Sequence, residues 1–178
     1  PDSSGRGLVF DDPRGAVSLG LPSSVGMVLS VPLAETIRND FPKVTLRVMD
    51  AMSGHVQQWL TEGSIDIGFL YNVEAVRHLK VQPLLTEELF LVASADGWPH
   101  PVGADGVADV PVNLADCADL GLILPSGAHG LREMIERYAR AQGVRLDISL
   151  EMDSLPQIKE LVARGSGYTI LSHSAAQR

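Results

Sequence analysis

The feature that most constrains the fold of this chain is the alternation of short apolar runs with longer segments of helical spacing. In the first half, strand-like runs at 16–21, 44–49 and 65–70 alternate with helical segments at 24–40 and 54–61. A strand, a helix and a second strand in this order form a parallel pair joined by a crossover helix. The first half of the chain is therefore predicted to form a βαβαβ unit.

The same pattern begins again after residue 88. Its elements are strand-like runs at 89–93, 120–124, 148–152 and 168–171, and helical segments at 131–142 and 155–163. On the segment 131–142, apolar residues share one side at helical spacing, namely Leu131, Met134, Ile135 and Tyr138. The sequence thus predicts an α/β protein of two Rossmann-like units. We expect a linker or cloning remnant at 1–14, a partial first unit at 15–71, a hinge or connector at 72–88, and a second unit at 89–178.

A Leu-Pro-Ser sequence occurs once in each predicted unit. "LPSSVG" covers Leu21–Gly26 and "LPSGAHG" covers Leu124–Gly130, and each lies between a strand and a helix. In parallel sheets, ligands bind beyond the carboxyl ends of the strands. The first N–H groups of a helix lack intrahelical partners and carry partial positive charge. The two segments therefore predict an anion pocket between the units, although serine is also a common helix cap without a ligand.

Charge and composition exclude several classes of function. Lys and Arg number 14 against 22 Asp and Glu, which gives a net charge of −8 and argues against nucleic-acid binding by this chain. The single Cys117 excludes an internal disulfide and favours a reducing compartment. No apolar run approaches the roughly 18–20 residues that span a membrane. We therefore expect no membrane partner, while the opening "PDSSGRG" leaves a removed export signal open.

Motifs of enzymes are missing from the sequence. It contains no G-x-S-x-G, G-x-x-x-x-G-K-[ST] or H-E-x-x-H pattern. The five histidines do not show metal-ligand spacing, and no cysteine pair is available. The sequence therefore predicts no catalytic residue, no metal and no cofactor.

Several stretches resemble the effector-binding domain of LysR-type transcriptional regulators. They are "PRGAVSLGLPSSVGMVLSVPL", "DAMSGHVQQWLTEGSIDIGFLY", "PLLTEELFLVAS", "LILPSGAHGLREMIERYARAQGV" and "MDSLPQIKELVARGSGYTILSHSAA". The resemblance covers about residues 13–176, and the stretch Pro125–Arg132 is most similar to the nitrogen-assimilation-control-like subgroup. One departure is that the family commonly has proline after the last strand, where this chain has Ser172 and His173.

The resemblance implies a fold and a function. The fold would be two Rossmann-like subdomains with a cleft between them, as in type 2 periplasmic binding proteins. The function would be that of a cytoplasmic transcription regulator controlled by a small anionic effector, without a cofactor. It would bind DNA through a winged helix-turn-helix, which we expect to be absent from this chain. We also expect the C-terminal return to the first subdomain to be missing, which would expose an edge of the first sheet. The alternative is a periplasmic solute-binding protein for an organic or inorganic anion.

The resemblance also implies a homodimer or tetramer. In the family, the helices that correspond to 24–40 and 131–142 meet across an antiparallel dimer. Each has apolar positions beyond its sheet-facing stripe, such as Val31 and Ala139.

The effector site that the resemblance implies consists of residues at the strand ends and helix starts. They are Ser23, Ser24, Ser53, Tyr71, Pro125, Ser126, His129, Ser172 and His173. A structural role remains open for several of them. Ser24 and Ser53 would serve only as caps, Tyr71 would pack in the core or hinge, and His129 would lie on a surface loop unless it is protonated beside a carboxylate. Arg132 has the i,i+4 spacing for an ion pair with Glu136.

Overall fold

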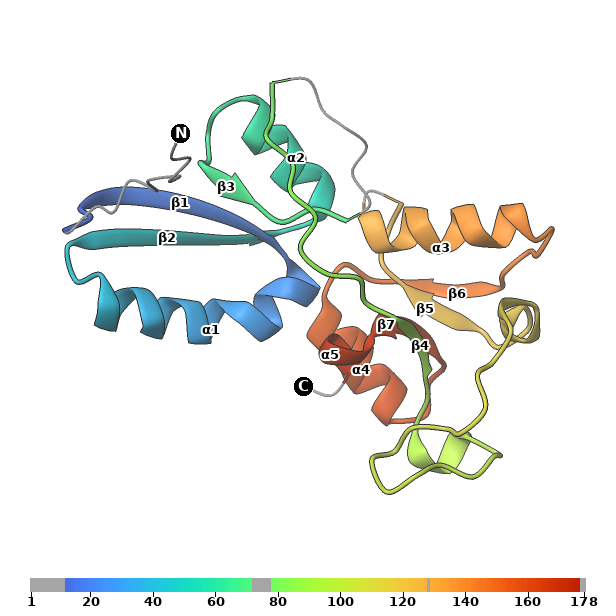
Figure 1. Cartoon of the computed structure of the whole chain (residues 1–178). Helices are drawn as coiled ribbons and strands as arrows, with labels where there is room; N and C mark the ends of the chain where they lie inside the picture. Colours follow the sequence, from blue (N-terminus) through green and yellow to red (C-terminus); the bar gives the residue numbers. More distant parts are fainter. Residues whose placement is uncertain (1–11, 72–77, 128, 177–178) are drawn as a thin grey trace, which may run out of the picture.

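The computed structural model describes residues 12–71, 78–127 and 129–176 (Figure 1). The first unit consists of β1 (Gly15–Pro22), α1 (Ser23–Asp40), β2 (Val44–Ala51), α2 (Ser53–Thr61) and β3 (Ile67–Gly68). Its strands form a parallel sheet in the order β2-β1-β3. The predicted βαβαβ unit is confirmed.

The third strand is shorter than predicted. β3 covers only Ile67–Gly68, whereas the apolar pattern predicts a strand over 65–70. Before β3, the carboxylate of Asp66 accepts hydrogen bonds from the Ser18 N–H at 2.8 Å and the Ser18 hydroxyl at 2.6 Å. The Asp66 N–H in turn donates to the Ser18 hydroxyl at 3.0 Å. The Asp66 N–H also donates to the Ser18 carbonyl at 3.1 Å, so both side-chain and backbone hydrogen bonds join this segment to β1.

The second unit contains nine short elements (Figure 1). They are β4 (Leu89–Val92), η1 (Ala95–Gly97), η2 (Leu114–Cys117), β5 (Leu122–Leu124), α3 (Gly130–Ala141), β6 (Ile148–Glu151), α4 (Leu155–Ala163), β7 (Thr169–Ser172) and α5 (His173–Ala176). β5 pairs with β6 in parallel and β4 pairs with β7 antiparallel, and a bridge between Leu122 and Tyr168 links the two pairs. The predicted helices and strands are confirmed, whereas η1, η2 and α5 were not predicted.

The core of the second unit lies on both faces of β5. Leu122 and Leu124 pack with Leu131 and Ile135 of α3, while Ile123 packs with two residues of α4, Ile158 and Val162. Figure 1 accordingly shows α3 and α4 on opposite sides of the β5–β6 pair. Because successive side chains of a strand point to opposite faces, three consecutive apolar residues can bury a helix on each side.

The buried face of α3 differs from the predicted one. Leu131 and Ile135 are buried as expected, but Tyr138 is 50% exposed. Arg132 and Ala139 are buried in its place, and Ala139 is only 4% exposed. The helix is therefore rotated about its axis from the predicted orientation. The expectation that Ala139 lies on a free surface is wrong, while Val31 of α1 is 67% exposed as expected.

The two units are joined by apolar packing as well as by the chain. α1 contacts α5, and Met27 in α1 packs against the core cluster of the second unit. The first turns of α1 therefore belong to both units. None of the helices in the described ranges is long and apolar enough to cross a membrane.

We expect Leu122→Ala to destabilise the chain by about 2–5 kcal/mol, because a fully buried leucine leaves a cavity when it is truncated. Leu150→Ala on the neighbouring strand is the matched control. Leu150 is 40% exposed, so its truncation should cost less than about 1 kcal/mol. Urea denaturation of the two variants measures the difference. Equal losses would contradict the placement of the core on β5.

Candidate functional site

The two serines at the start of α1 bond to side chains outside the helix. The Ser23 hydroxyl donates to Asp50 Oδ1 at 2.6 Å, and the buried Ser24 hydroxyl lies 2.5 Å from the Tyr71 hydroxyl. The N-cap of α1 is Pro22, and no side-chain hydrogen bond caps the helix. The interpretation of Ser24 as a cap is therefore wrong, since its hydroxyl pairs with the residue that follows the first unit's last strand.

Tyr71 connects this region to the chain that enters the second unit. Burial raises the pKa of the Tyr71 hydroxyl above its ordinary 10.0, the hydrogen bond from Ser24 opposes the rise, and the negative charge of Glu87 adds to it. Glu87 accepts a hydrogen bond from the Ser174 hydroxyl of α5. A polar path thus leads from the start of α1 through Tyr71 and Glu87 to α5.

Ser53 makes a direct polar link between the two units. Its buried hydroxyl accepts a hydrogen bond from the Gly130 N–H at 2.8 Å, and it caps no helix. Ser53 begins α2 and Gly130 begins α3, so the N-terminal ends of two helices from different units meet here. A Cβ at position 130 would collide with the Ser53 hydroxyl, and glycine at this position permits the contact.

His129 is buried beside this contact, and neither alternative from the sequence describes it. It is 6% exposed and caps α3, because its Nδ1 accepts a hydrogen bond from the Leu131 N–H at 3.3 Å. Burial lowers the pKa of the imidazole below 6.5, against the opposing effect of the Asp153 and Asp50 carboxylates. The ring is therefore neutral at pH 7. Since Nδ1 is an acceptor, Nε2 carries the proton, and it has no hydrogen-bond partner among the residues that the structure describes.

The Pro125–Ser126 segment is held by two side chains of the second unit. The Ser126 N–H donates to Asp153 Oδ1 at 2.8 Å, and this hydrogen bond lowers the pKa of Asp153. The Pro125 carbonyl accepts a hydrogen bond from Arg132 Nη1 at 2.9 Å. The predicted ion pair between Arg132 and Glu136 is confirmed at 2.7 Å.

Arg132 also reaches the outer strand, where it pairs with Glu151 at 3.0 Å. The buried guanidinium therefore anchors this segment to both α3 and β6.

Ser172 and His173 lie at the start of α5, at the other end of the polar path. The Ser172 hydroxyl is 3.4 Å from both the Ser174 hydroxyl and the Ala175 nitrogen. His173 is exposed and its ring lies 5.1 Å from that of Phe90, between centroids. These two residues therefore lie with α5 and β4, whereas Ser53 and His129 form hydrogen bonds with α3.

Two carboxylates of this region were missed by the sequence reasoning. Asp50 is near the end of β2 and Asp153 follows β6, so each lies at the carboxyl end of a parallel strand. Each accepts a hydrogen bond from the serine of a Leu-Pro-Ser sequence 27 positions earlier. The signal was available, because both acidic residues directly follow a predicted strand or end it, where ligand-binding groups gather.

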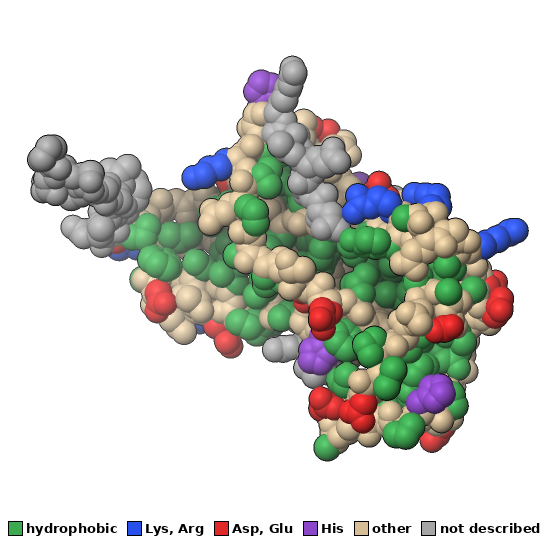
Figure 2. Space-filling view, turned by 45° about the vertical axis from the view of Figure 1, so that its right-hand side comes forward, with side chains coloured by type: hydrophobic (Ala, Val, Ile, Leu, Met, Phe, Trp, Pro, Cys, Tyr) green, Lys and Arg blue, Asp and Glu red, His purple; other side chains and the backbone are tan. Residues whose placement is uncertain are grey.

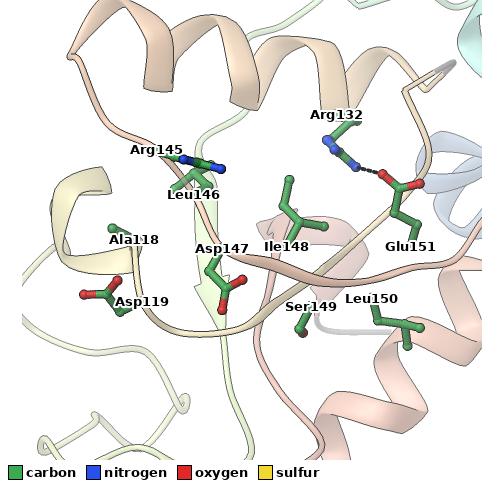
Figure 3. A pocket seen from close by; sticks show the side chains of 10 residues that line it. All are labelled: Ala118, Asp119, Arg132, Arg145, Leu146, Asp147, Ile148, Ser149, Leu150 and Glu151. Atoms are coloured by element: carbon green, nitrogen blue, oxygen red, sulfur yellow. Dashed lines mark hydrogen bonds and ion pairs between the residues drawn. The ribbon is translucent and has the colours of Figure 1, made fainter.

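A separate groove of about 790 Å³ runs along the outer edge of β6 (Figure 3). Arg132 and Glu151 lie at one end of it and Arg145 at the other. None of the nine predicted site residues lines this groove. In the described ranges of the chain, no group of three or more His, Cys, Asp or Glu side chains is arranged to hold a metal ion.

Comparison with known proteins gives the class of this fold and site. The family model described as the LysR substrate binding domain matches residues 10–178. The chain belongs to this family.

The relatives are bacterial transcription regulators. The chain is 29% identical over 168 residues to the nitrogen assimilation regulatory protein nac of Klebsiella aerogenes, which covers 92% of this chain and 51% of the relative. It is 28% identical over 158 residues to the HTH-type transcriptional regulator BbuR of Bordetella bronchiseptica, with 89% and 46% covered. The chain thus spans about half the length of these relatives.

Solved structures agree on the fold. HinK, a LysR family transcriptional regulator from Pseudomonas aeruginosa, superposes with a TM-score of 0.74 at 22% identity, over 91% of this chain and 53% of that chain. The C-terminal domain of a probable LysR family regulator from Rhodococcus superposes with a TM-score of 0.73 at 22% identity, over 89% and 74%. The expected fold, two α/β subdomains of the periplasmic-binding-protein type, is confirmed.

We expect His129 to titrate below pH 6.5 in the folded chain. Asp153→Asn should lower its pKa further, because the variant removes a negative charge that favours the imidazolium. The folded state then binds fewer protons than the unfolded state, so stability should fall as the pH drops below 6.5. NMR titration of the imidazole C–H signals measures the pKa, with Asp147→Asn as the control. A pKa above 6.5 would contradict the buried, neutral ring.

Proposed function

We propose that this chain binds a small effector at the junction of its two subdomains and thereby regulates transcription. The main support is the hydrogen bond between Ser53 and Gly130, because it connects the two subdomains through groups that a ligand can also bind. The family supports the regulatory role, and its relatives supply no support for the alternative of a periplasmic solute-binding protein.

The proposed effector site contains the nine residues expected from the sequence. Its centre is Ser53, His129 and Ser126, with Pro125 beneath them, and Ser23, Ser24 and Tyr71 form the side contributed by the first subdomain. Ser172 and His173 form the far end, beside α5. We infer that an acidic group of the effector is bound at the start of α3, where the Gly130 N–H and His129 Nε2–H are donors and the helix end carries partial positive charge.

The proposed mechanism is a shift between two relative orientations of the subdomains. A ligand that bonds to both α2 and α3 replaces the direct contact of Ser53 with Gly130 and favours the spacing that fits it. Only a difference in affinity between the two orientations can shift their populations. In the full-length regulator, this shift would change how a winged helix-turn-helix meets DNA.

The remaining expectations are kept as proposals. We propose a cytoplasmic regulator without catalytic activity, with subdomains at 15–71 and 89–178 joined by a connector at 72–88. Residues 1–11 of the proposed linker at 1–14 and residues 72–77 of the connector lie outside the described residues. We propose a homodimer or tetramer in which α1 and α3 meet, with the exposed Val31 on that surface.

We expect Ser53→Ala to weaken effector binding at least tenfold. The variant removes a hydroxyl that would bond to an acidic ligand, and a hydrogen bond to a charged group contributes about 1.5–3 kcal/mol. Ser149→Ala, on β6, is the control and should bind like the wild type. Thermal-shift screening of inorganic sulfate, dicarboxylates and amino acids finds ligands, and calorimetry measures their affinity. The proposal fails if no small molecule binds or if Ser53→Ala binds unchanged.

We also expect this chain alone not to bind duplex DNA at physiological salt. Its net charge of −8 opposes the phosphate backbone. Figure 2 shows Asp and Glu side chains spread over the face drawn, beside a few Lys and Arg, and the described residues form no continuous basic surface there. Gel shifts at about 0.15 M salt test this, and a salt-dependent complex would contradict it.

A further inference from the structure

Two carboxylates, one from each subdomain, lie at the proposed effector site. Asp50 is bound by the Ser23 hydroxyl and Asp153 by the Ser126 N–H, and each uses one oxygen in that bond. A carboxylate offers about four acceptor positions, so both retain capacity for further donors. Both side chains belong to exposed residues, and both carboxylates act on His129. Asp50 lies three residues before Ser53, whose hydroxyl binds the Gly130 N–H, and Asp153 binds Ser126, three residues before His129, so both belong to segments that meet at the start of α3.

The described part of the chain supplies no cation to these carboxylates. Its ion pairs are made by other acidic residues, and neither Asp50 nor Asp153 is among them. The buried guanidinium of Arg132 is already engaged by Glu136 and Glu151. His129, on which both carboxylates act, is neutral at pH 7. Two unpaired carboxylates repel each other when the subdomains approach, so a positive group between them would favour the approach.

Hydrogen-bond donors that can bind a negative group lie next to these two carboxylates. His129 is 94% buried by its 6% exposure, and its Nε2–H has no partner among the described residues although Nδ1 is bonded. It precedes α3, a helix of 12 residues whose first N–H groups include that of Gly130. Among the described residues, the fully buried side-chain nitrogens and oxygens without a partner are Trp98 Nε1 and Thr169 Oγ1, so His129 Nε2 is open to solvent and can donate to a ligand. The site thus offers donors and carboxylates side by side.

We propose that the effector is a zwitterion of the amino-acid type, with its acidic group at His129 and Gly130 and its ammonium between Asp50 and Asp153. This inference rests on the proposed function and specifies the ligand class. A simple anion would add a third negative charge to the two carboxylates. A simple amine would offer no acceptor to the Nε2–H of His129. An α-amino acid carries both groups on one carbon and matches both parts of the site.

The test compares matched ligands. The standard amino acids are screened by thermal shift, and any ligand found is compared by calorimetry with its N-acetyl derivative, its deaminated acid and its decarboxylated amine. We expect each of the three analogues to bind at least tenfold more weakly than the amino acid, because each lacks one charged group. An analogue without the amino group that binds as tightly as the amino acid would overturn the inference.

Two variants test whether the ammonium of the ligand lies between Asp50 and Asp153. Asp50→Asn and Asp153→Asn keep the size of the side chain, and each should weaken binding of the amino acid at least tenfold without weakening the deaminated acid. Asp147→Asn, on the groove outside the site, is the control and should leave both affinities unchanged. Thermal melts show whether each variant folds. If either site variant fails to fold, the comparison of the amino acid with its three analogues on the wild-type protein still tests the inference.

The outcomes separate this inference from the proposed function. Sulfate or a carboxylic acid that binds more tightly to Asp153→Asn, and is lost in Ser53→Ala, would overturn the zwitterion and leave the effector site standing. Amino-acid binding that is indifferent to Ser53→Ala, Asp50→Asn and Asp153→Asn would overturn both. Absence of binding by all amino acids would overturn the zwitterion.

Discussion

The arrangement of the two subdomains depends on the contact between Ser53 and Gly130. Its single hydrogen bond contributes only about 1 kcal/mol to stability, as is usual for a bond exchanged with water. It also makes a steric demand, because a Cβ at position 130 would collide with the Ser53 hydroxyl at this spacing of α2 and α3. The subdomains also meet through apolar packing, where α1 contacts α5 and Met27 joins the second core. A ligand can replace the hydrogen bond but not the apolar packing. The polar side of the junction is therefore the side that can respond to an effector.

The electrostatics of the junction depend on which hydrogen-bond donors are already bonded to carboxylates. Asp50 accepts a hydrogen bond from Ser23 at the start of α1, and Asp153 accepts one from Ser126 in the segment before α3. Without these carboxylates, the same donors would attract an external anion. The burial that keeps His129 neutral leaves one N–H donor available. The expectation of an anion pocket came from helix ends alone and did not include these carboxylates. A site with internal carboxylates selects for a ligand that brings its own positive charge.

The sequence predicted local structure better than the contacts between elements. The βαβαβ pattern and the helices α3 and α4 follow from periodicity, which is a property of consecutive residues. The hydrogen bonds between Asp66 and Ser18 join residues 48 positions apart, and no local pattern contains that information. The apolar pattern placed Tyr138 on the buried side of α3 and Arg132 outside it. The structure has the reverse, because the ion pairs of Arg132 allow this charged residue to be buried. Ser53 and His129 were predicted as site residues from the family resemblance, but their partners come only from the tertiary structure.

The two Leu-Pro-Ser sequences occupy equivalent positions in the two subdomains. In each, the apolar run before the serine is a strand, β1 or β5, that pairs in parallel with the next strand, β2 or β6. In each, the aspartate that binds the serine is 27 positions later, at the end of that second strand. The chemistry of the contact differs, since Ser23 donates through its hydroxyl, whereas Ser126 donates through its backbone N–H and also hydrogen-bonds through its side chain. The recurring element is therefore larger than the three residues, because it includes the aspartate that faces the junction. Two such elements on opposite sides place one carboxylate on each, so a ligand that bonds to both aspartates must contact both subdomains at once. This is the requirement for a molecule that controls their relative orientation.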